Sequence, residues 1–163
     1  QMIARKPALL TPEGLAKLQA EHEQLTHEGR EEVADRLHRA FEDGQDDDFV
    51  DNAELEAARN EQAFLEGRIQ ELEDILSNYE IIPENDMSPD EVNIGDRVTV
   101  VEEGYEEEER YHLVGAAEAD PVEGRISNES PLGRALLGAR VDEVVTFEAP
   151  GGLTSFRVVK IND

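Results

Sequence analysis

A heptad repeat after residue 57 places the strongest limit on what this chain can fold into. Mostly apolar residues recur with alternating spacings of four and three, at Ala58, Gln62, Leu65, Ile69, Leu72, Leu76 and Tyr79. This spacing predicts a long helix that buries one seam against another helix. We expect the helix to end before Pro83, because the residue that precedes a proline is pushed out of helical geometry.

A second helical stretch precedes the heptad repeat. Thr11 is a suitable N-cap, Pro12 suits the first helical position, and no proline interrupts residues 13–44. Apolar residues recur at helical spacing, but the stripe shifts by four residues before Val33, as in a stutter. A helix from Pro12 to about Glu42 would be about 45 Å long. The two stretches predict an antiparallel coiled-coil hairpin over residues 1–82, in which seam residues His22 and Gln62 set packing or register.

The loop between these helices is dense in carboxylates. Asp46, Asp47, Asp48 and Asp51 lie within six residues, in an acidic tip over residues 44–54. Like charges repel, so the cluster makes sense if the tip meets a metal ion or a basic surface elsewhere. The alternative is that the carboxylates are solvated and that some of them cap the second helix. The loop lacks the alternating pattern of a Ca²⁺ site, which disfavours a Ca²⁺ buffer.

The last third of the chain has a different period. After a proline-containing linker at 83–91, apolar residues alternate with a period of two and predict strands. The expected strands cover residues 97–101, 110–114, 144–147 and 156–161. Residues 131–137 predict one short helix with Ser130 as its cap. The fold class is therefore α+β, with a small antiparallel sheet and one short helix in residues 92–163.

Composition excludes several classes of function. The 15 Lys and Arg residues face 40 Asp and Glu residues, for a net charge of -25, which argues against a broad nucleic-acid-binding surface. The chain has no Cys, so disulfides and thiol chemistry are excluded. It shows no signal-peptide pattern and no long apolar run, so we expect a cytoplasmic protein without membrane contact. No nucleophile constellation is visible, and the histidines lack metal-ligand spacing, so we expect no enzyme activity from the chain alone.

Four segments resemble the GreA/GreB family of bacterial transcript cleavage factors: LTPEGLAKLQAE, DNAELEAARNEQAFLEGRIQELEDILSN, NESPLGRALLGARVDEV and TFEAPGGLTSFRVVKI. The resemblance implies that the C-terminal domain is FKBP-like and docks at the rim of the RNA polymerase secondary channel. It implies a coiled coil that reaches the polymerase active site and stimulates cleavage of backtracked RNA. The expected partners are bacterial RNA polymerase and the 3′ end of the nascent RNA. We expect a monomer in isolation.

The resemblance also assigns residues. The family tip runs Gly-Asp, two residues, an acid and Asn-Ala, and this order places the two acidic roles on Asp48 and Asp51. In the family these acids help to hold the second Mg²⁺ and to orient a water, so we expect Mg²⁺ only in the complex with polymerase and none on the isolated chain. Asp46 and Asp47 would be auxiliary tip residues, and Arg59 would contact RNA.

Three further residues match family positions at the polymerase rim: Asp120, Ser130 and Pro131. Their structural alternative is a loop acid, a helix cap and a first-turn proline. Both interpretations are open from the sequence.

Departures from the family pattern leave a second function open. Residues 45–47 are inserted before Asp48, Asp51 is shorter than the usual Glu, and Leu55 stands where Tyr is common. The basic patch that contacts RNA is also thin. These features favour the Gre-homologous inhibitor branch, whose acidic tip occupies the same channel and blocks NTP entry or catalysis. The DNAE run and Arg59 resemble the cleavage branch, so the sequence favours cleavage by a small margin.

Overall fold

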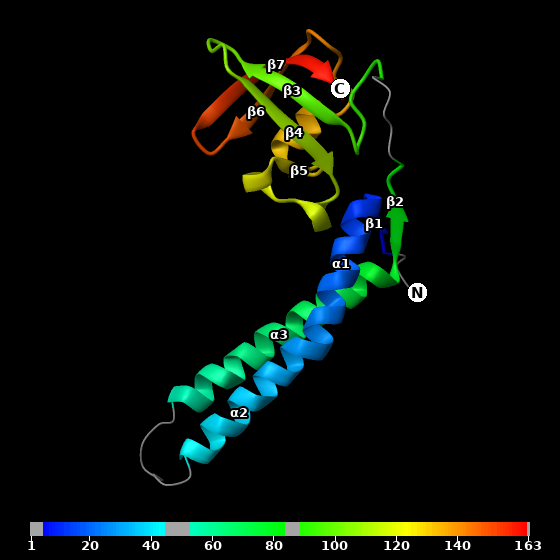
Figure 1. The fold of residues 1–163 in the computed structure, drawn as a ribbon. Coiled ribbons are helices and arrows are strands. Elements are labelled where there is room, and N and C mark those ends of the chain that lie inside the picture. The colour runs from blue at the N-terminus through cyan, green and yellow to red at the C-terminus, as the bar shows by residue number, and fades with distance from the viewer. Residues whose placement is uncertain (1–4, 45–52, 84–88, 163) are drawn as a thin grey trace. The chain divides into compact units, whose positions relative to one another are not determined.

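The computed structural model describes residues 5–44, 53–83 and 89–162 of the chain. The chain divides into two compact units, one of residues 16–77 and one of residues 1–15 together with 78–163 (Figure 1). The first unit is a helical hairpin, and the second is built around a curled sheet with a short helix. The α+β class and the N-terminal helical hairpin are therefore as the sequence predicts.

The first arm of the hairpin is helical throughout its described length, but it is not one regular helix. It consists of α1 (Pro12–Gln24), the π-helical turn η1 (Leu25–Gly29) and α2 (Arg30–Gly44). A π-helical turn holds more residues than an α-helical one. It coincides with the shift in the apolar stripe that the sequence shows before Val33.

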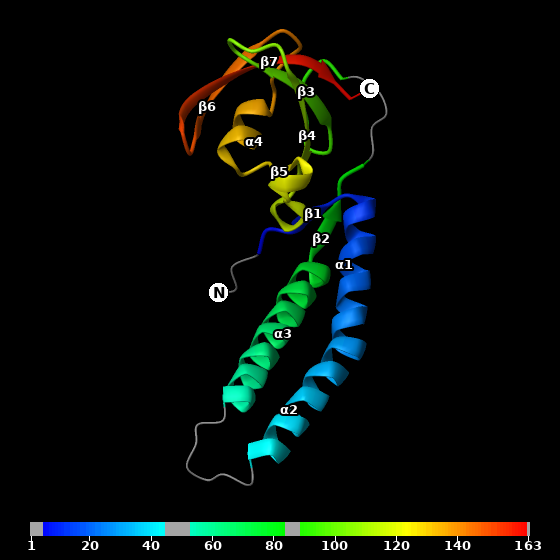
Figure 2. The ribbon, with the colours of Figure 1, turned by 60° about the vertical axis from the view of Figure 1, so that its left-hand side comes forward.

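The second arm is α3 (Ala53–Ser77), and its heptad seam faces the first arm. Its buried residues are Ala58, Leu65, Ile69 and Leu72, which confirms these seam positions. Val33 of α2 joins Leu65 and Ile69 in one core cluster. Gln62, by contrast, is exposed. Figures 1 and 2 both show α2 and α3 side by side.

The second helix ends earlier than the heptad repeat predicts. Helix α3 ends at Ser77, and Tyr79 belongs to the strand β2 (Tyr79–Ile81). This strand pairs in parallel with β1 (Ala8–Leu10), from the opposite end of the hairpin sequence. Pairing with a distant strand therefore overrides the local helical pattern at Tyr79, which is exposed although it stands in heptad register.

The larger sheet has five strands in the order β5-β4-β3-β7-β6. Their bounds are β3 (Arg97–Glu102), β4 (Glu108–Val114), β5 (Arg125–Ser127), β6 (Val144–Ala149) and β7 (Gly152–Ile161). The four strands that the sequence predicts are all present. The four predicted strands pair antiparallel as expected, but the sheet has a fifth strand, β5, which pairs in parallel with β4. The connection from β4 to β5 makes this pairing possible, since it includes the short helical turns η2 (Ala116–Glu118) and η3 (Pro121–Glu123).

Helix α4 (Pro131–Leu136) lies in the concave face of this sheet, which curls around it (Figure 2). Strand residues such as Val98, Val158 and Ile161 form one core cluster with Leu136 of α4. The helix approaches closely because Gly133 has no side chain: a Cβ there would lie 1.9 Å from the carbonyl oxygen of Ser127. The core therefore occupies one face of the sheet and leaves the other face available for polar residues.

Candidate functional site

The acidic tip lies outside the described residues. Asp46, Asp47, Asp48 and Asp51 fall between the end of α2 at Gly44 and the start of α3 at Ala53. Both helix ends lie at the same end of the hairpin, because the arms run in opposite directions (Figure 1). The start of α3 carries the positive end of a helix dipole, which favours nearby carboxylates. The roles of the four aspartates stay predictions.

Ion pairs between its two arms brace the hairpin. Arg30 donates two hydrogen bonds to the carboxylate of Glu66, at 3.0 and 2.8 Å. Arg68 binds Glu21 in the same two-pronged way, with both distances at 2.8 Å. The hydrogen bond from Arg68 lowers the pKa of Glu21 below its usual value, although partial burial opposes this shift. Because such forked pairs demand one geometry, they hold the register of the arms that present the tip.

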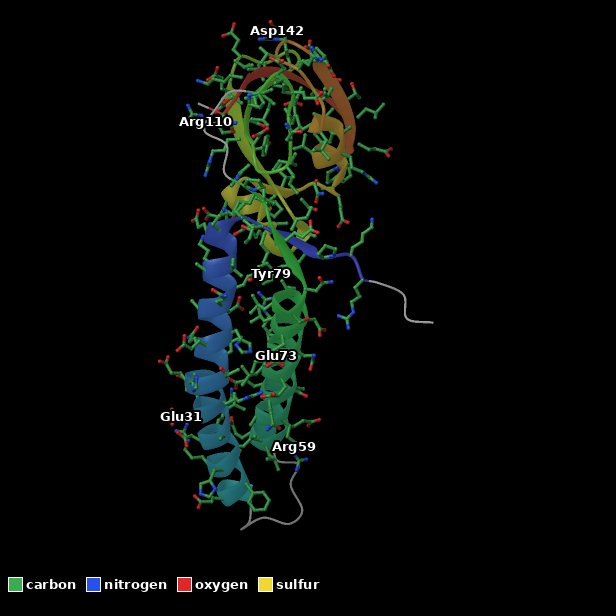
Figure 3. The ribbon with its side chains drawn as sticks, turned by 90° about the vertical axis from the view of Figure 1, so that its right-hand side faces the viewer. Glu31, Arg59, Glu73, Tyr79, Arg110 and Asp142 are labelled. Atoms are coloured by element: carbon green, nitrogen blue, oxygen red, sulfur yellow. The ribbon has the colours of Figure 1, made fainter. Side chains whose placement is uncertain are left out.

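Arg59 differs from these arginines. It lies on α3 near the tip end of the hairpin, where Figure 3 labels it. Its side chain is exposed and forms no ion pair with residues 5–44, 53–83 or 89–162. The exposure of the side chain is compatible with the predicted contact with RNA, but that contact is untested.

The three predicted docking residues lie at the two ends of the short strand β5. Asp120 is exposed, and its backbone exchanges hydrogen bonds with Arg125 at 2.7 and 3.0 Å. Ser130 follows the other end of the strand. Its hydroxyl donates to the Ser127 carbonyl at 2.7 Å and accepts from the Gly133 N–H at 3.1 Å. Because a strand rises about 3.3 Å per residue, its ends are only about 7 Å apart.

The capping role of Ser130 is thus confirmed, and Pro131 occupies the first helical position of α4. Pro131 is exposed beside the capped serine, and Asp120 is exposed at the far end of the strand. Their docking role remains a prediction. The Ser130 hydroxyl already has two hydrogen-bond partners, so the exposed Asp120 and Pro131 are more accessible to a docking partner.

A buried carboxylate that no sequence pattern predicted anchors the start of α1. The carboxylate of Glu118 accepts hydrogen bonds from the Thr11 backbone N–H at 2.6 Å and from the Thr11 hydroxyl at 2.7 Å, and it pairs with Arg125. The Thr11 hydroxyl in turn caps α1 through the Gly14 N–H at 3.0 Å. A Cβ on Gly14 would lie 2.0 Å from the Glu118 carboxylate. One sequence signal was Gly14 itself, since glycine is a poor helix former.

The described part of the chain offers no metal site of its own. No group of three His, Asp or Glu side chains within the described ranges is placed to hold a metal ion. None of the helices in those ranges is both long enough and apolar enough to span a bilayer.

Two family models together cover almost the whole chain. The N-terminal model of transcription elongation factors matches residues 8–81, and the GreA/GreB C-terminal model matches residues 87–163. The chain belongs to the GreA/GreB family of transcription elongation factors. The resemblance seen in the sequence is thereby confirmed.

Two relatives in sequence agree with this assignment. The chain is 47% identical over 156 residues to the transcription elongation factor GreA of Thermoanaerobacter pseudethanolicus, covering 96% of this chain and 98% of the relative. It is 49% identical to GreA of Roseiflexus castenholzii over the same shares. Among solved structures, GreA factor homolog 1 (Gfh1) of Thermus thermophilus is 33% identical, with 97% of this chain and 100% of that chain covered and a TM-score of 0.43. The GreA/GreB family consists of regulators of transcription rather than stand-alone enzymes, as expected for this chain.

Proposed function

We propose that this chain binds bacterial RNA polymerase in the cytoplasm and stimulates the Mg²⁺-dependent cleavage of backtracked nascent RNA. The observation that carries the proposal is a helical hairpin, braced by forked ion pairs, whose closing loop contains four aspartates in sequence. Membership of the GreA/GreB family supports it. In this proposal residues 1–82 are the coiled coil that enters the secondary channel, and 83–91 are the linker.

The donor set of the tip fits a hard divalent cation. Mg²⁺ prefers carboxylate oxygen and keeps several waters, and Asp48 and Asp51 supply such oxygens. When bound, the ion activates a water and stabilises charge on the reacting phosphate. The two carboxylates would hold that ion and accept hydrogen bonds from the attacking water. The reaction itself belongs to the polymerase, which is why the chain needs no catalytic site of its own.

The remaining predicted residues act in recognition. Arg59, which is exposed and has no ion pair with the described residues, would contact the phosphates of the extruded RNA near the tip. The C-terminal unit, proposed to be an FKBP-like domain over residues 92–163, would dock at the channel rim. Asp120 and Pro131 are exposed at the two ends of β5 and would face the polymerase, and Ser130 caps α4 beside Pro131.

A second function rests on the inserted tip residues. Asp46 and Asp47 raise the number of tip aspartates to four within six residues, more than one catalytic pair requires. A tip with this charge would also compete for the metal or block NTP entry. The second candidate is therefore an inhibitor that occupies the same channel.

Stalled elongation complexes provide the test of cleavage. The purified factor should release short 3′ RNA fragments, and Asp48→Asn or Asp51→Asn should lower the rate at least tenfold. Glu31→Gln is the matched control, because it removes one exposed charge from the hairpin without breaking an ion pair within the described ranges (Figure 3). Absence of fragments, or full activity of Asp48→Asn, would end the cleavage proposal.

An abortive-initiation assay separates the inhibitor from the cleavage factor. An inhibitor should lower the yield of short transcripts as its concentration rises, and the double change Asp46→Asn with Asp47→Asn should restore synthesis. Unchanged synthesis at saturating factor would rule this function out. Docking is tested in parallel by co-sedimentation with polymerase, where Asp120→Ala should weaken binding and Glu31→Gln should not.

A further inference from the structure

One face of the C-terminal sheet gathers positive charge in a chain that is otherwise strongly acidic. Arg97 of β3 stands opposite His112 of β4, and Thr99 stands opposite Arg110. Because side chains alternate along a strand, all four lie on the same face. Val98, between Arg97 and Thr99, points into the core instead. The four residues therefore lie on the outer face of the sheet, away from α4.

The neighbouring strands extend this face. Arg125 of β5 stands beside His112, and Lys160 of β7 stands beside Thr99. Arg125 is neutralised by its buried pair with Glu118. In contrast, the side chains of Arg97, Arg110 and Lys160 form no ion pair with the part of the chain that the structure describes. Three cations thus remain uncompensated on adjacent strands.

A pocket of about 310 Å³ opens on this face. Arg97 and Arg110 line it together with Thr99. Thr99 is only 5% exposed, yet its hydroxyl has no hydrogen-bond partner among the described residues. Buried polar groups nearly always have a partner, and every described side-chain nitrogen or oxygen sealed from solvent has one. The unpaired hydroxyl therefore opens into the pocket and is free to bind a ligand.

His112, which also lines the pocket, responds to its positive surroundings. Its Nε2 lies 3.2 Å from the Gly95 carbonyl oxygen, to which it donates. Burial lowers the pKa of His112, and the charges of Arg97 and Arg125 lower it further. The ring is therefore neutral at neutral pH, and the charge of the pocket comes from its arginines.

We propose that this pocket binds a small phosphorylated sugar compound, such as a nucleotide, through its phosphate. Two guanidinium groups provide forked donors for phosphate oxygens, and the Thr99 hydroxyl adds a third. Glu123 also lines the pocket, and its carboxylate is an acceptor for sugar hydroxyls. The volume falls at the small end of the range of about 300–1,000 Å³ for small-molecule sites.

The surroundings of the pocket disfavour a longer nucleic acid. Residues 102–109, from the end of β3 to the start of β4, contain six glutamates. A strand of several phosphates would meet this acidic segment after leaving the two arginines, and it would be repelled by a chain with a net charge of -25. A compound with one phosphorylated end needs only the local positive field.

Calorimetric titration of the full chain with AMP at low salt tests the proposal. Saturable one-to-one binding is expected. Arg97→Gln and Arg110→Gln should each weaken it about tenfold, as expected for charged hydrogen bonds to a ligand. Thr99→Val should weaken it several-fold, while Thr99→Ser, which keeps the hydroxyl, should not. Arg157→Gln is the matched control, because Arg157 lies on the neighbouring strand β7, pairs with Asp142 at 3.6 Å and does not line the pocket.

Further probes identify which part of the ligand is recognised. Adenosine should fail to bind, and inorganic phosphate should bind more weakly than AMP. Glu123→Gln should reduce the difference between AMP and inorganic phosphate. Equal binding of adenosine and AMP, binding of a single-stranded oligonucleotide alone, or no saturation with any probe would overturn the proposal. Because no polymerase is present, the result is independent of the cleavage assay.

Discussion

The two units of the molecule use arginine in opposite ways. In the helical hairpin, Arg30 and Arg68 each form a two-pronged ion pair with a glutamate on the other arm. On the outer face of the sheet, Arg97 and Arg110 lie diagonally across the adjacent strands β3 and β4 without an acidic partner among the described residues. The ion pairs of the hairpin fix the register of its two arms, whereas the outer face of the sheet gathers positive charge that an external anion can neutralise. In a chain this acidic, unpaired arginines on neighbouring strands are a stronger functional signal than paired ones.

The largest loss of stability is expected where the ion pair of an arginine is buried. Glu118→Ala would leave Arg125 and the Thr11 N–H without their acceptor in a site where the Glu118 side chain is 3% exposed. Breaking a buried pair in this way costs about 3–5 kcal/mol. Urea denaturation should therefore show a fall of this size in the free energy of unfolding. Glu118→Gln keeps one acceptor oxygen and should lose less; a loss below about 1 kcal/mol for Glu118→Ala would contradict the role assigned to this carboxylate.

A smaller loss of stability is expected in the hairpin than at Glu118, and none is expected on the outer face of the sheet. Arg68→Gln breaks a partly exposed pair in the hairpin and should lower the free energy of unfolding by about 0.5–1 kcal/mol. Arg110→Gln removes a charge that repels Arg97 and should cost nothing measurable. High salt should shrink the effect of Arg68→Gln, because it screens the pair. Equal losses for the two variants would remove the distinction between bracing and displayed arginines.

The two units should also differ in their response to acid. His112 has a pKa below its usual 6.5, so its contribution to stability is complete above pH 6.5 and is lost as the pH falls through the lowered value. Glu21 has a pKa below 4.5, so its contribution is lost only at lower pH. Acidification from pH 7 should therefore weaken the sheet before the hairpin. Urea denaturation of the original chain and of His112→Gln should be compared across this pH range. The free energy of unfolding of His112→Gln should change less with pH just below pH 6.5, and the same pH dependence in both proteins would contradict the prediction.

The smallest effect on stability is expected at Arg59. This arginine lies on the hairpin, but it makes no ion pair within the described ranges. Arg59→Gln should change the free energy of unfolding by less than about 0.5 kcal/mol, as is usual for an isolated surface residue. RNA cleavage in stalled complexes should nevertheless fall several-fold if the residue contacts RNA. A stability loss like that of Arg68→Gln would place Arg59 among the bracing arginines instead.

Local patterns predicted the long elements and failed where distant segments meet. The heptad positions Leu65, Ile69 and Leu72 are buried as expected, and the period of two located four strands of the sheet. Strands β1, β2 and β5 have three residues each, too few to show a period. Tyr79 fits the heptad, yet it pairs with Ala8.

In the candidate sites too, features set by neighbouring residues were predicted, and features set by distant residues were not. The Ser130 cap was visible in the sequence, because capping depends on neighbours three residues apart. The carboxylate of Glu118 binds Thr11 across 107 positions, and the basic face depends on strand register, so neither could be seen locally. The tip aspartates were recognised by resemblance, and their geometry stays a prediction.

The π-helical turn η1 determines which face of the following helix, α2, points toward α3. Each residue of an α-helix turns the chain by about 100°. Five α-helical residues in place of η1 would turn the chain further, because a π-helical turn holds more residues than an α-helical one, and they would carry Val33 away from Leu65 and Ile69. The chain would also leave Gly44 on another side of the helix. The side on which α2 ends is thus decided by a turn at the opposite end of that helix.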